Sequence, residues 1–144
     1  MLSKASEYAI RALVYICIKS HDSKRPGYRE IAKQIEAPEQ FTAKVLQSLV
    51  RSGFLRSVRG RGGGFFFEEG SKPITILEII TEIEGDHLFT RCGIGLNQCS
   101  DEFPCPIHHQ YAIIREQYKK LAESTTIESL AERIIAGDAV LNRL

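Results

Sequence analysis

A glycine-rich turn between two short apolar segments constrains the fold of this 144-residue chain more than any other feature. Residues 54–58 (FLRSV) and 64–67 (GFFF) have the composition of β-strands, and residues 59–63 (RGRGG) supply a flexible tip between them. The sequence therefore predicts a β-hairpin that carries Arg59 and Arg61 at its tip. A phosphate-binding loop is the competing interpretation, but it needs a helix N-terminus after the glycines, and three phenylalanines and two glutamates follow instead.

Two predicted helices precede the hairpin and are separated by a turn of about three residues. The first runs from Tyr28 to Ile35 after a turn signal at residues 25–27, and the second runs from Pro38 to Ser52. The apolar face of the second helix is predicted to consist of Phe41, Val45, Leu46 and Leu49. Two such helices followed by a hairpin are typical of a winged helix-turn-helix, in which the hairpin is the wing and the second helix reads the DNA major groove.

A long helix is predicted at residues 4–20, before the helix-turn-helix. It is apolar almost all round from Ala9 to Ile18, and such a helix is normally covered on two sides. We therefore expect it to lie between the core of the domain and a partner chain. Cys17 lies on this helix, far in sequence from the other three cysteines, and is interpreted as a small buried apolar side chain.

Charge is distributed unevenly along the chain, although the formal net charge is only +1. Residues 1–67 contain 12 Lys/Arg and 5 Asp/Glu, whereas residues 68–144 contain 7 and 13. A basic N-terminal half is typical of a surface that binds a polyanion, above all nucleic acid, and scattered solvated charge is the alternative. The predicted DNA contacts are Gln40 and Lys44 for base edges, Tyr28, Arg29 and Arg51 for phosphates, and Arg59 and Arg61 for a narrow minor groove.

The C-terminal half is predicted to begin with a helix at residues 75–84 that a capping box opens. No hydrophobic period survives at residues 86–104, so a loop is predicted there. The next helix carries apolar residues at steps of 4, 3, 4 and 3, a coiled-coil seam suited to a dimer axis, with an amphipathic helix packed on its own domain as the alternative. The seam residues are Ile107, Tyr111, Ile114, Tyr118 and Leu121. A last helix is predicted after a cap formed by Thr125 and Glu128.

Three cysteines and a histidine stand close together in the predicted loop and at the start of the helix after it. Cys92, Cys99, Cys105 and His108 have the spacing C-x6-C-x5-C-x2-H. Soft thiolates with an imidazole can hold an iron–sulfur cluster or a metal ion, and a structural zinc site is one such use. No signal peptide and no stretch near the roughly 18 apolar residues of a membrane span are recognised, so we expect a cytoplasmic protein whose cysteines are not disulfide-bonded.

These patterns predict a mostly α-helical protein with two parts. The first is a winged helix-turn-helix DNA-binding domain at residues 1–72, and the second, residues 73–144, contains a cluster-binding loop (86–108) and a long dimerisation helix. An enzyme is not expected, because no nucleophile–base pair or pair of carboxylates stands out. An electron-transfer protein would use the same cysteine and histidine ligands, but it has no need of an arginine-tipped wing.

Four segments of the chain are similar to the Rrf family of bacterial winged-helix regulators. They are the opening SKASEYAIRALVYI, the wing SVRGRGGGFFF, the segment ITILEIITEIEG and the three-cysteine loop, and the resemblance extends over residues 1–135. The family includes iron–sulfur-cluster regulators of the IscR type and nitric-oxide sensors of the NsrR type. The resemblance implies a homodimeric transcriptional regulator whose DNA affinity is controlled by a cluster that senses iron–sulfur status, nitric oxide or redox stress. A two-fold dimer of this kind binds a palindromic site on double-stranded DNA.

The resemblance also implies the ligands of the cluster. Cys92, Cys99 and Cys105 match the cysteines of both cluster-bearing branches, although the gap of six residues between the first two is one longer than usual. His108 matches the histidine that completes a 2Fe–2S cluster in the IscR type. Glu7 matches, by its place in the first helix, the aspartate that the other subunit supplies to a 4Fe–4S cluster in the NsrR type. Both fourth ligands stay open, as do a zinc-bound regulator and a cluster-free regulator that responds to a metabolite or a partner enzyme.

Overall fold

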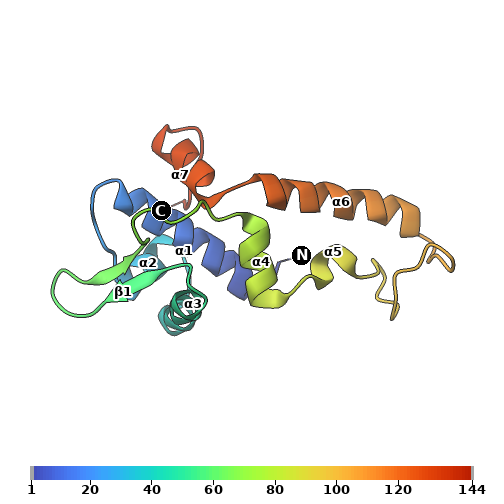
Figure 1. Ribbon diagram of the computed structural model, residues 1–144, viewed down its shortest axis with the longest axis horizontal. Helices are drawn as coiled ribbons and strands as arrows, with labels where there is room; N and C mark the ends of the chain where they lie inside the picture. The colour runs from blue at the N-terminus through green and yellow to red at the C-terminus, as the bar shows by residue number, and fades with distance from the viewer. Residues whose placement is uncertain (1, 144) are drawn as a thin grey trace.

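The computed structural model describes residues 2–143, which form seven helices and one two-stranded antiparallel sheet (Figure 1). The helices are α1 (Lys4–Ser20), α2 (Tyr28–Gln34), α3 (Glu39–Arg51), α4 (Ile76–Glu84), α5 (His87–Thr90), α6 (His108–Ser124) and α7 (Ile127–Ile135), and the strands are β1 (Arg56–Val58) and β2 (Gly64–Phe66). The mostly helical fold with a small hairpin is thus confirmed. Figure 1 shows the hairpin and the loop before α6 at opposite ends of the long axis.

Helix α1 is the centre of the main core. Its residues Ala9, Ala12 and Leu13 have no exposed surface, because α2, α3 and α4 pack against part of the helix and α7 covers another part. The apolar pattern correctly predicted a helix covered on two sides, and the chain's own α7 supplies the second cover. Cys17 is buried in this core, as predicted.

The helix-turn-helix forms as predicted, with two local corrections. Pro38 is the residue that caps α3 and lies just before its first turn, in extended conformation, rather than inside the helix. The inner face of α3 includes Thr42, which is fully buried and donates its hydroxyl to the carbonyl of Pro38 at 2.8 Å. Phe41, which was predicted to face inward, is 40% exposed and packs edge-on against Tyr8 at the rim of the core.

The wing is shorter than the sequence predicted and is attached to the loop before α2. Strand β1 starts only at Arg56, because Leu55 turns into the core and is 2% exposed. The backbone N–H of Phe65 donates to the carbonyl of Pro26 at 2.9 Å. Gly64 has φ +150°, and a Cβ there would lie 2.2 Å from the carbonyl oxygen of Arg25, so this close approach admits only glycine.

Two backbone hydrogen bonds join the start of α4 to the start of α7. Ile76 N–H donates to the carbonyl of Thr125 at 2.9 Å, and Ile127 N–H donates to the carbonyl of Ile74 at 2.8 Å. The predicted capping box of α4 is confirmed. The predicted cap of α7 is wrong by one residue, because Thr126 forms it together with Ser129.

Helix α6 packs on α4 and α5 through a second, smaller core. This core consists of Ile80, Phe89 and Ala122, with Tyr118 at its edge, 5.8 Å from the ring of Phe89. The segment predicted as loop contains the four-residue helix α5, which is too short to show a hydrophobic period. The α5 segment therefore supplies part of the surface on which α6 rests.

The carboxylate of Glu84 joins the end of α4 to the start of α1. It accepts hydrogen bonds from the backbone N–H and the hydroxyl of Ser3 at 3.0 and 2.8 Å, and from the hydroxyl of Ser6. Burial by itself would raise the pKa of Glu84, but the hydrogen bonds from Ser6 and Ser3 outweigh it and lower the pKa below its ordinary value. The ionised carboxylate is therefore the form that the fold favours.

Replacing Glu84 with alanine is expected to lower the free energy of unfolding by about 1–3 kcal/mol, because the buried hydroxyl of Ser6 and the half-buried hydroxyl of Ser3 lose their acceptor. Because the pKa of Glu84 is lowered on folding, its contribution is present above pH 4.5 and is lost as the pH falls below that value. Urea unfolding across pH 3–7 measures both effects. Glu82→Ala, which removes only an exposed bond to Ser52, is the control, and equal losses in the two variants would contradict the assignment.

Candidate nucleic-acid interface and metal centre

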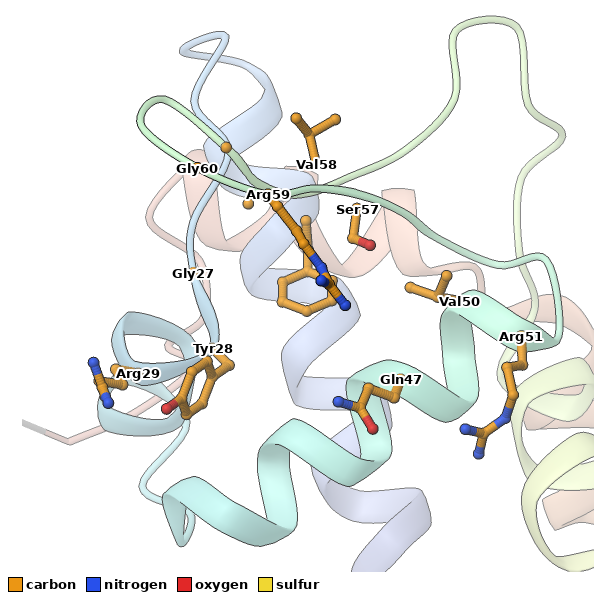
Figure 2. A pocket seen from close by; sticks show the side chains of 13 residues that line it. Gly27, Tyr28, Arg29, Gln47, Val50, Arg51, Ser57, Val58, Arg59 and Gly60 are labelled. Carbon is orange, nitrogen blue, oxygen red and sulfur yellow. The ribbon is translucent and has the colours of Figure 1, made fainter.

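A groove of about 830 Å³ lies between α3 and the wing, with the first turn of α2 at one side (Figure 2). Figure 2 shows Arg59 extending from the wing toward α3, where Gln47 and Arg51 are located. The polar and charged side chains that line the groove are those of Tyr28, Arg29, Gln47, Arg51, Ser57 and Arg59. The close approach of Gly64 to Arg25 holds the wing against the loop before α2 and so fixes one wall of the groove.

The structure brings four of the seven predicted DNA contacts to this groove. They are Tyr28, Arg29, Arg51 and Arg59. The other three, Gln40, Lys44 and Arg61, are exposed but lie outside its lining. The predicted contacts did not include Gln47, which is exposed on α3, or Ser57, for which a three-residue strand gives no distinctive signal.

Two of the groove arginines lack an acidic partner within residues 2–143. Among the described residues, no carboxylate lies within ion-pair distance of Arg51 or Arg59, whereas Arg29 pairs with Glu39 at 3.8 Å. Unpaired guanidinium groups along one groove leave positive charge available to an anionic ligand such as a DNA backbone. The helix-turn-helix side of the molecule therefore has both the shape and the charge of a nucleic-acid interface.

Cys92 follows α5 and is buried at 5% exposure. Backbone N–H groups of Ile94 and Leu96 donate to its sulfur, and this lowers the pKa of the Cys92 thiol, with smaller help from the Cys105 side chain and against the effect of burial. The loop thus wraps its own amides around one thiolate. Such a backbone nest suits a sulfur that carries negative charge.

Cys99 and His108 form a second pair. The sulfur of Cys99 lies 3.3 Å from Nδ1 of His108, and the other ring nitrogen, Nε2, lies 2.6 Å from a carboxylate oxygen of Asp101. His108 is only 7% exposed and is held in the first turn of α6, where its N–H donates to the carbonyl of Cys105 at 3.0 Å. The hydrogen bond and charge of His108 lower the pKa of Asp101.

Of the four predicted ligands, Cys99 and His108 are in direct contact, and the Cys105 side chain is near enough to Cys92 to help lower the pKa of its thiol. Within residues 2–143, the set of possible metal ligands whose donor atoms all lie within 4.8 Å of one another is instead Asp101, His108 and His109. Sequence reasoning missed Asp101, because nothing in the spacing of an exposed loop carboxylate marks it as a partner of His108.

Two further side chains bear on the candidate ligands. Glu7 lies in the first turn of α1, where its carboxylate accepts from Nζ of Lys4 at 3.1 Å. Cys17 lies in the main core, and burial, followed by the nearby Glu128 and Glu132, raises the pKa of its thiol to about 11. A thiol of that kind stays protonated, which agrees with a packing role for Cys17.

The predicted seam of α6 is divided between two faces. Ile114 and Leu121 are 61% and 60% exposed, and Ile107 is 37% exposed. Tyr111 and Tyr118 instead turn toward their own chain, Tyr118 against Phe89 and Tyr111 against the loop that contains Cys92. Ile113, which is outside the predicted seam, is also 61% exposed, so the outer side of α6 carries several exposed apolar side chains among its polar ones.

Comparison with known proteins identifies the class of regulator. Residues 2–133 match the Rrf2 family, described as iron-dependent transcriptional regulator. The chain belongs to the Rrf2 family. Its relatives are regulators of transcription and not enzymes, as the sequence predicted.

Individual relatives agree with this assignment. The chain is similar to a candidate HTH-type transcriptional regulator of Aquifex aeolicus (strain VF5), with 32% identity over 90% of both chains. It is 28% identical to the HTH-type transcriptional regulator NsrR of Oceanobacillus iheyensis, over 90% of this chain and 88% of that protein. Among solved structures it resembles CymR, the global cysteine regulator of B. subtilis, with a TM-score of 0.71, 25% identity, and coverage of 92% and 96%. The T. potens IscR structure shares the fold with a TM-score of 0.67 at 19% identity, over 96% of this chain and 92% of that one.

None of the described helices combines the length and apolar content that crossing a membrane requires.

Replacing Arg59 with alanine is expected to weaken binding to any DNA duplex, because an unpaired cation is removed from the groove. If Arg59 neutralises one phosphate, the slope of log affinity against log salt should become shallower by about 0.9. Fluorescence anisotropy with a labelled non-specific duplex, repeated over a series of salt concentrations, measures this slope. Arg56→Ala is the matched control, because Arg56 lies on the same hairpin but is already paired with Glu68 at 2.9 Å. An unchanged slope in Arg59→Ala would contradict the placement.

Proposed function

We propose that this Rrf2-family regulator is a homodimer whose DNA affinity is controlled by an iron–sulfur cluster. The proposed ligands are Cys92, Cys99, Cys105 and His108, and the proposed DNA contacts are those of the groove and of the outer face of α3. The observation that carries the proposal is the contact of Cys99 with His108 at 3.3 Å, backed by Asp101. Residues 1–72 then bind DNA, and residues 73–144 hold the cluster and the dimer helix, with α7 packed back on α1.

The donor set fits an iron–sulfur cluster. Cys92 sits in a nest of backbone N–H groups that favours its thiolate, and Cys105 lies next to it. Thiolates are the usual ligands of such clusters, and backbone N–H groups directed at cysteine sulfur are a common means of adjusting them. The cluster, when bound, supplies sensitivity to oxidants, to nitric oxide and to the supply of iron and sulfide.

His108 is the fourth ligand that the contacts favour. A histidine that ligates a metal normally gives its other ring N–H to a carboxylate or carbonyl, and Asp101 occupies that place at 2.6 Å from Nε2. Nδ1 is thereby left on the side of Cys99. This arrangement supports a 2Fe–2S cluster. A 4Fe–4S cluster completed by Glu7 of the partner subunit is the alternative, and Glu7 is engaged by Lys4 within its own chain.

The cluster would connect the two helices between which its loop runs. Cys92 follows α5, whereas Cys105 and His108 lie at the start of α6. Loss of the cluster would leave the intervening loop, residues 93–104, with few apolar contacts of its own, since Ile94 and Leu96 are more than half exposed. We expect this release to change the position of α6, and with it the spacing of two DNA-binding halves on a palindromic site.

The outer side of α6 is the proposed dimer surface. Ile107, Ile114 and Leu121 recur every seven residues, which aligns them in one stripe on a helix, and Ile113 widens it. Exposed apolar side chains in such a row are typical of a surface that another chain covers. Tyr111 and Tyr118 belong to the inner side of α6, so their part in the dimer would be to support the helix. A cytoplasmic location, with the signal being iron–sulfur status, nitric oxide or redox stress, completes the proposal.

Protein purified without oxygen is expected to absorb visible light, and the absorption should bleach when nitric oxide or oxygen is added. Single Cys92→Ala, Cys99→Ala and Cys105→Ala proteins should lose most of this absorption, because each removes a thiolate. They should also lose the dependence of DNA binding on iron in the growth medium. Unchanged DNA binding in all three proteins, with and without iron, would contradict a cluster switch and favour a metabolite or a partner enzyme as the signal. A colourless protein that contains zinc would favour the zinc-bound regulator.

The fourth ligand is tested in the same assay by His108→Ala and Glu7→Gln. Ligation by His108 predicts a changed spectrum and faster loss of the cluster in the first protein and a normal spectrum in the second. The reverse result, together with four irons per chain, would establish the carboxylate and the 4Fe–4S form instead.

Replacing both Ile114 and Leu121 with glutamate is expected to convert the protein to a monomer, because two charges would be buried in each copy of an apolar interface. Sedimentation velocity measures the mass, and circular dichroism checks that α6 is intact. Glu123→Lys, which changes an exposed charge on the opposite side of the same helix, is the control for altered charge. A double variant that sediments like the unchanged protein would show that α6 does not form the interface.

A further inference from the structure

Arg115 lies on α6, two turns after His108, and its side chain contacts the cysteine loop at two points. Its Nη1 donates to the carbonyl of Arg91 at 2.7 Å and lies 3.3 Å from the sulfur of Cys99. The first acceptor belongs to the residue immediately before Cys92. One guanidinium group therefore links the segments that carry two of the proposed ligands.

The residue one turn earlier on α6 completes this contact. The ring of Tyr111 lies against the backbone of Gly93, so closely that a Cβ on Gly93 would be 2.7 Å from the ring. The guanidinium carbon of Arg115 is 5.8 Å from the centre of the same ring. Residues four apart share one helix face, so Tyr111 and Arg115 form a single surface of α6 that holds residues 91–93.

Polar contacts, rather than apolar burial, hold the middle of this loop, and the bond of Asp101 to His108 is one of them. Ile94 and Leu96 are 54% and 51% exposed, and Phe103 is 79% exposed, so apolar burial contributes little to the order of the segment. Within the described part of the chain, the side chains that bond to the sulfur of Cys99 are those of Arg115 and His108. Loop segments with few buried contacts open easily unless polar contacts fix them.

We propose that Arg115 is a positioning residue of the metal centre, which holds Cys99 and the start of the cysteine loop against α6 before a metal or cluster binds. This inference rests on the proposed function for its ligands and extends it to a residue that the spacing of cysteines does not reveal. The guanidinium suits the role because its N–H groups lie in a fixed plane and can serve a sulfur and a carbonyl together. The same contacts connect the state of the loop to α6, the proposed dimer helix.

The test titrates metal-free, full-length protein with Co²⁺, which reports thiolate ligation through its charge-transfer absorption. Arg115→Gln is expected to bind Co²⁺ about tenfold more weakly and with lower charge-transfer intensity per metal, because Cys99 is no longer held in place. Hydrogen exchange of the metal-free protein should also show faster exchange at residues 92–99. Lys120→Gln removes a positive charge from an exposed position on the same helix and should leave all three measurements unchanged.

The Arg115→Lys variant distinguishes a positioning effect of the guanidinium group from an effect of its positive charge alone. A positioning role predicts a defect close to that of Arg115→Gln, because the ammonium group cannot reproduce the planar fork. Normal binding in the lysine protein with a defect in the glutamine protein would overturn the proposal in favour of a purely electrostatic effect. Unchanged Co²⁺ affinity, spectrum and exchange in Arg115→Gln would overturn it outright.

The outcome is independent of the regulatory switch, because the titration contains no DNA. If the cysteine variants lose Co²⁺ binding but keep iron-independent DNA binding, the proposed function fails while the role of Arg115 in the metal centre stands. If Arg115→Gln binds Co²⁺ normally while the cysteine variants lose the dependence of DNA binding on iron, the proposed function stands and the role of Arg115 fails.

Discussion

The burial of α1 on two sides determines how the rest of the chain must run. Leu13 and its neighbours are removed from solvent by α3 and α4 on one part of the helix and by α7 on another. Because α7 follows α6 in the chain, the intervening elements lie outside the main core. They are α5, the cysteine loop and α6, and the chain re-enters the main core at α7. The return is fixed by the backbone hydrogen bonds between residues 74–76 and 125–127. The segment from α5 to α6 is therefore a long insertion whose two ends are held by backbone hydrogen bonds at the main core.

The parts of the fold that were predictable from sequence are those whose structure is determined by residues close together in the chain. The glycine and arginine turn, the helix-turn-helix and the capping box of α4 all depend on residues within one or two turns of one another. The errors arise where a contact that the pattern does not reveal competes with it. Thr42, rather than Phe41, faces the core, because its hydroxyl can donate to the carbonyl of Pro38. The pattern of α1, which is apolar on all sides, does not distinguish cover by a partner chain from cover by α7.

The candidate metal centre was likewise predictable only where short-range sequence patterns determine it. Spacing alone identified the cysteines and His108, because these residue types are rare and stand close together. The contact of Cys99 with His108, and the roles of Asp101 and Arg115, depend on how an exposed loop without hydrophobic period folds back on α6. The heptad pattern of α6 likewise predicted an apolar helix, but it could not distinguish Tyr111 and Tyr118, which face their own chain, from Ile114 and Leu121, which face outward.

The separation of the two cores indicates how a signal at the loop would reach DNA. The groove residues belong to elements of the main core, whereas α5 and α6 meet α4 through the small cluster of Ile80, Phe89 and Ala122. The wing and the cysteine loop also lie at opposite ends of the molecule (Figure 1). A change in the loop is therefore expected to tilt α6 on this small joint and to leave the groove within one chain intact. Since α6 is the proposed dimer helix, the quantity that would change is the distance between two intact DNA-binding halves, and affinity for a palindromic site depends on that distance far more than affinity for random DNA does.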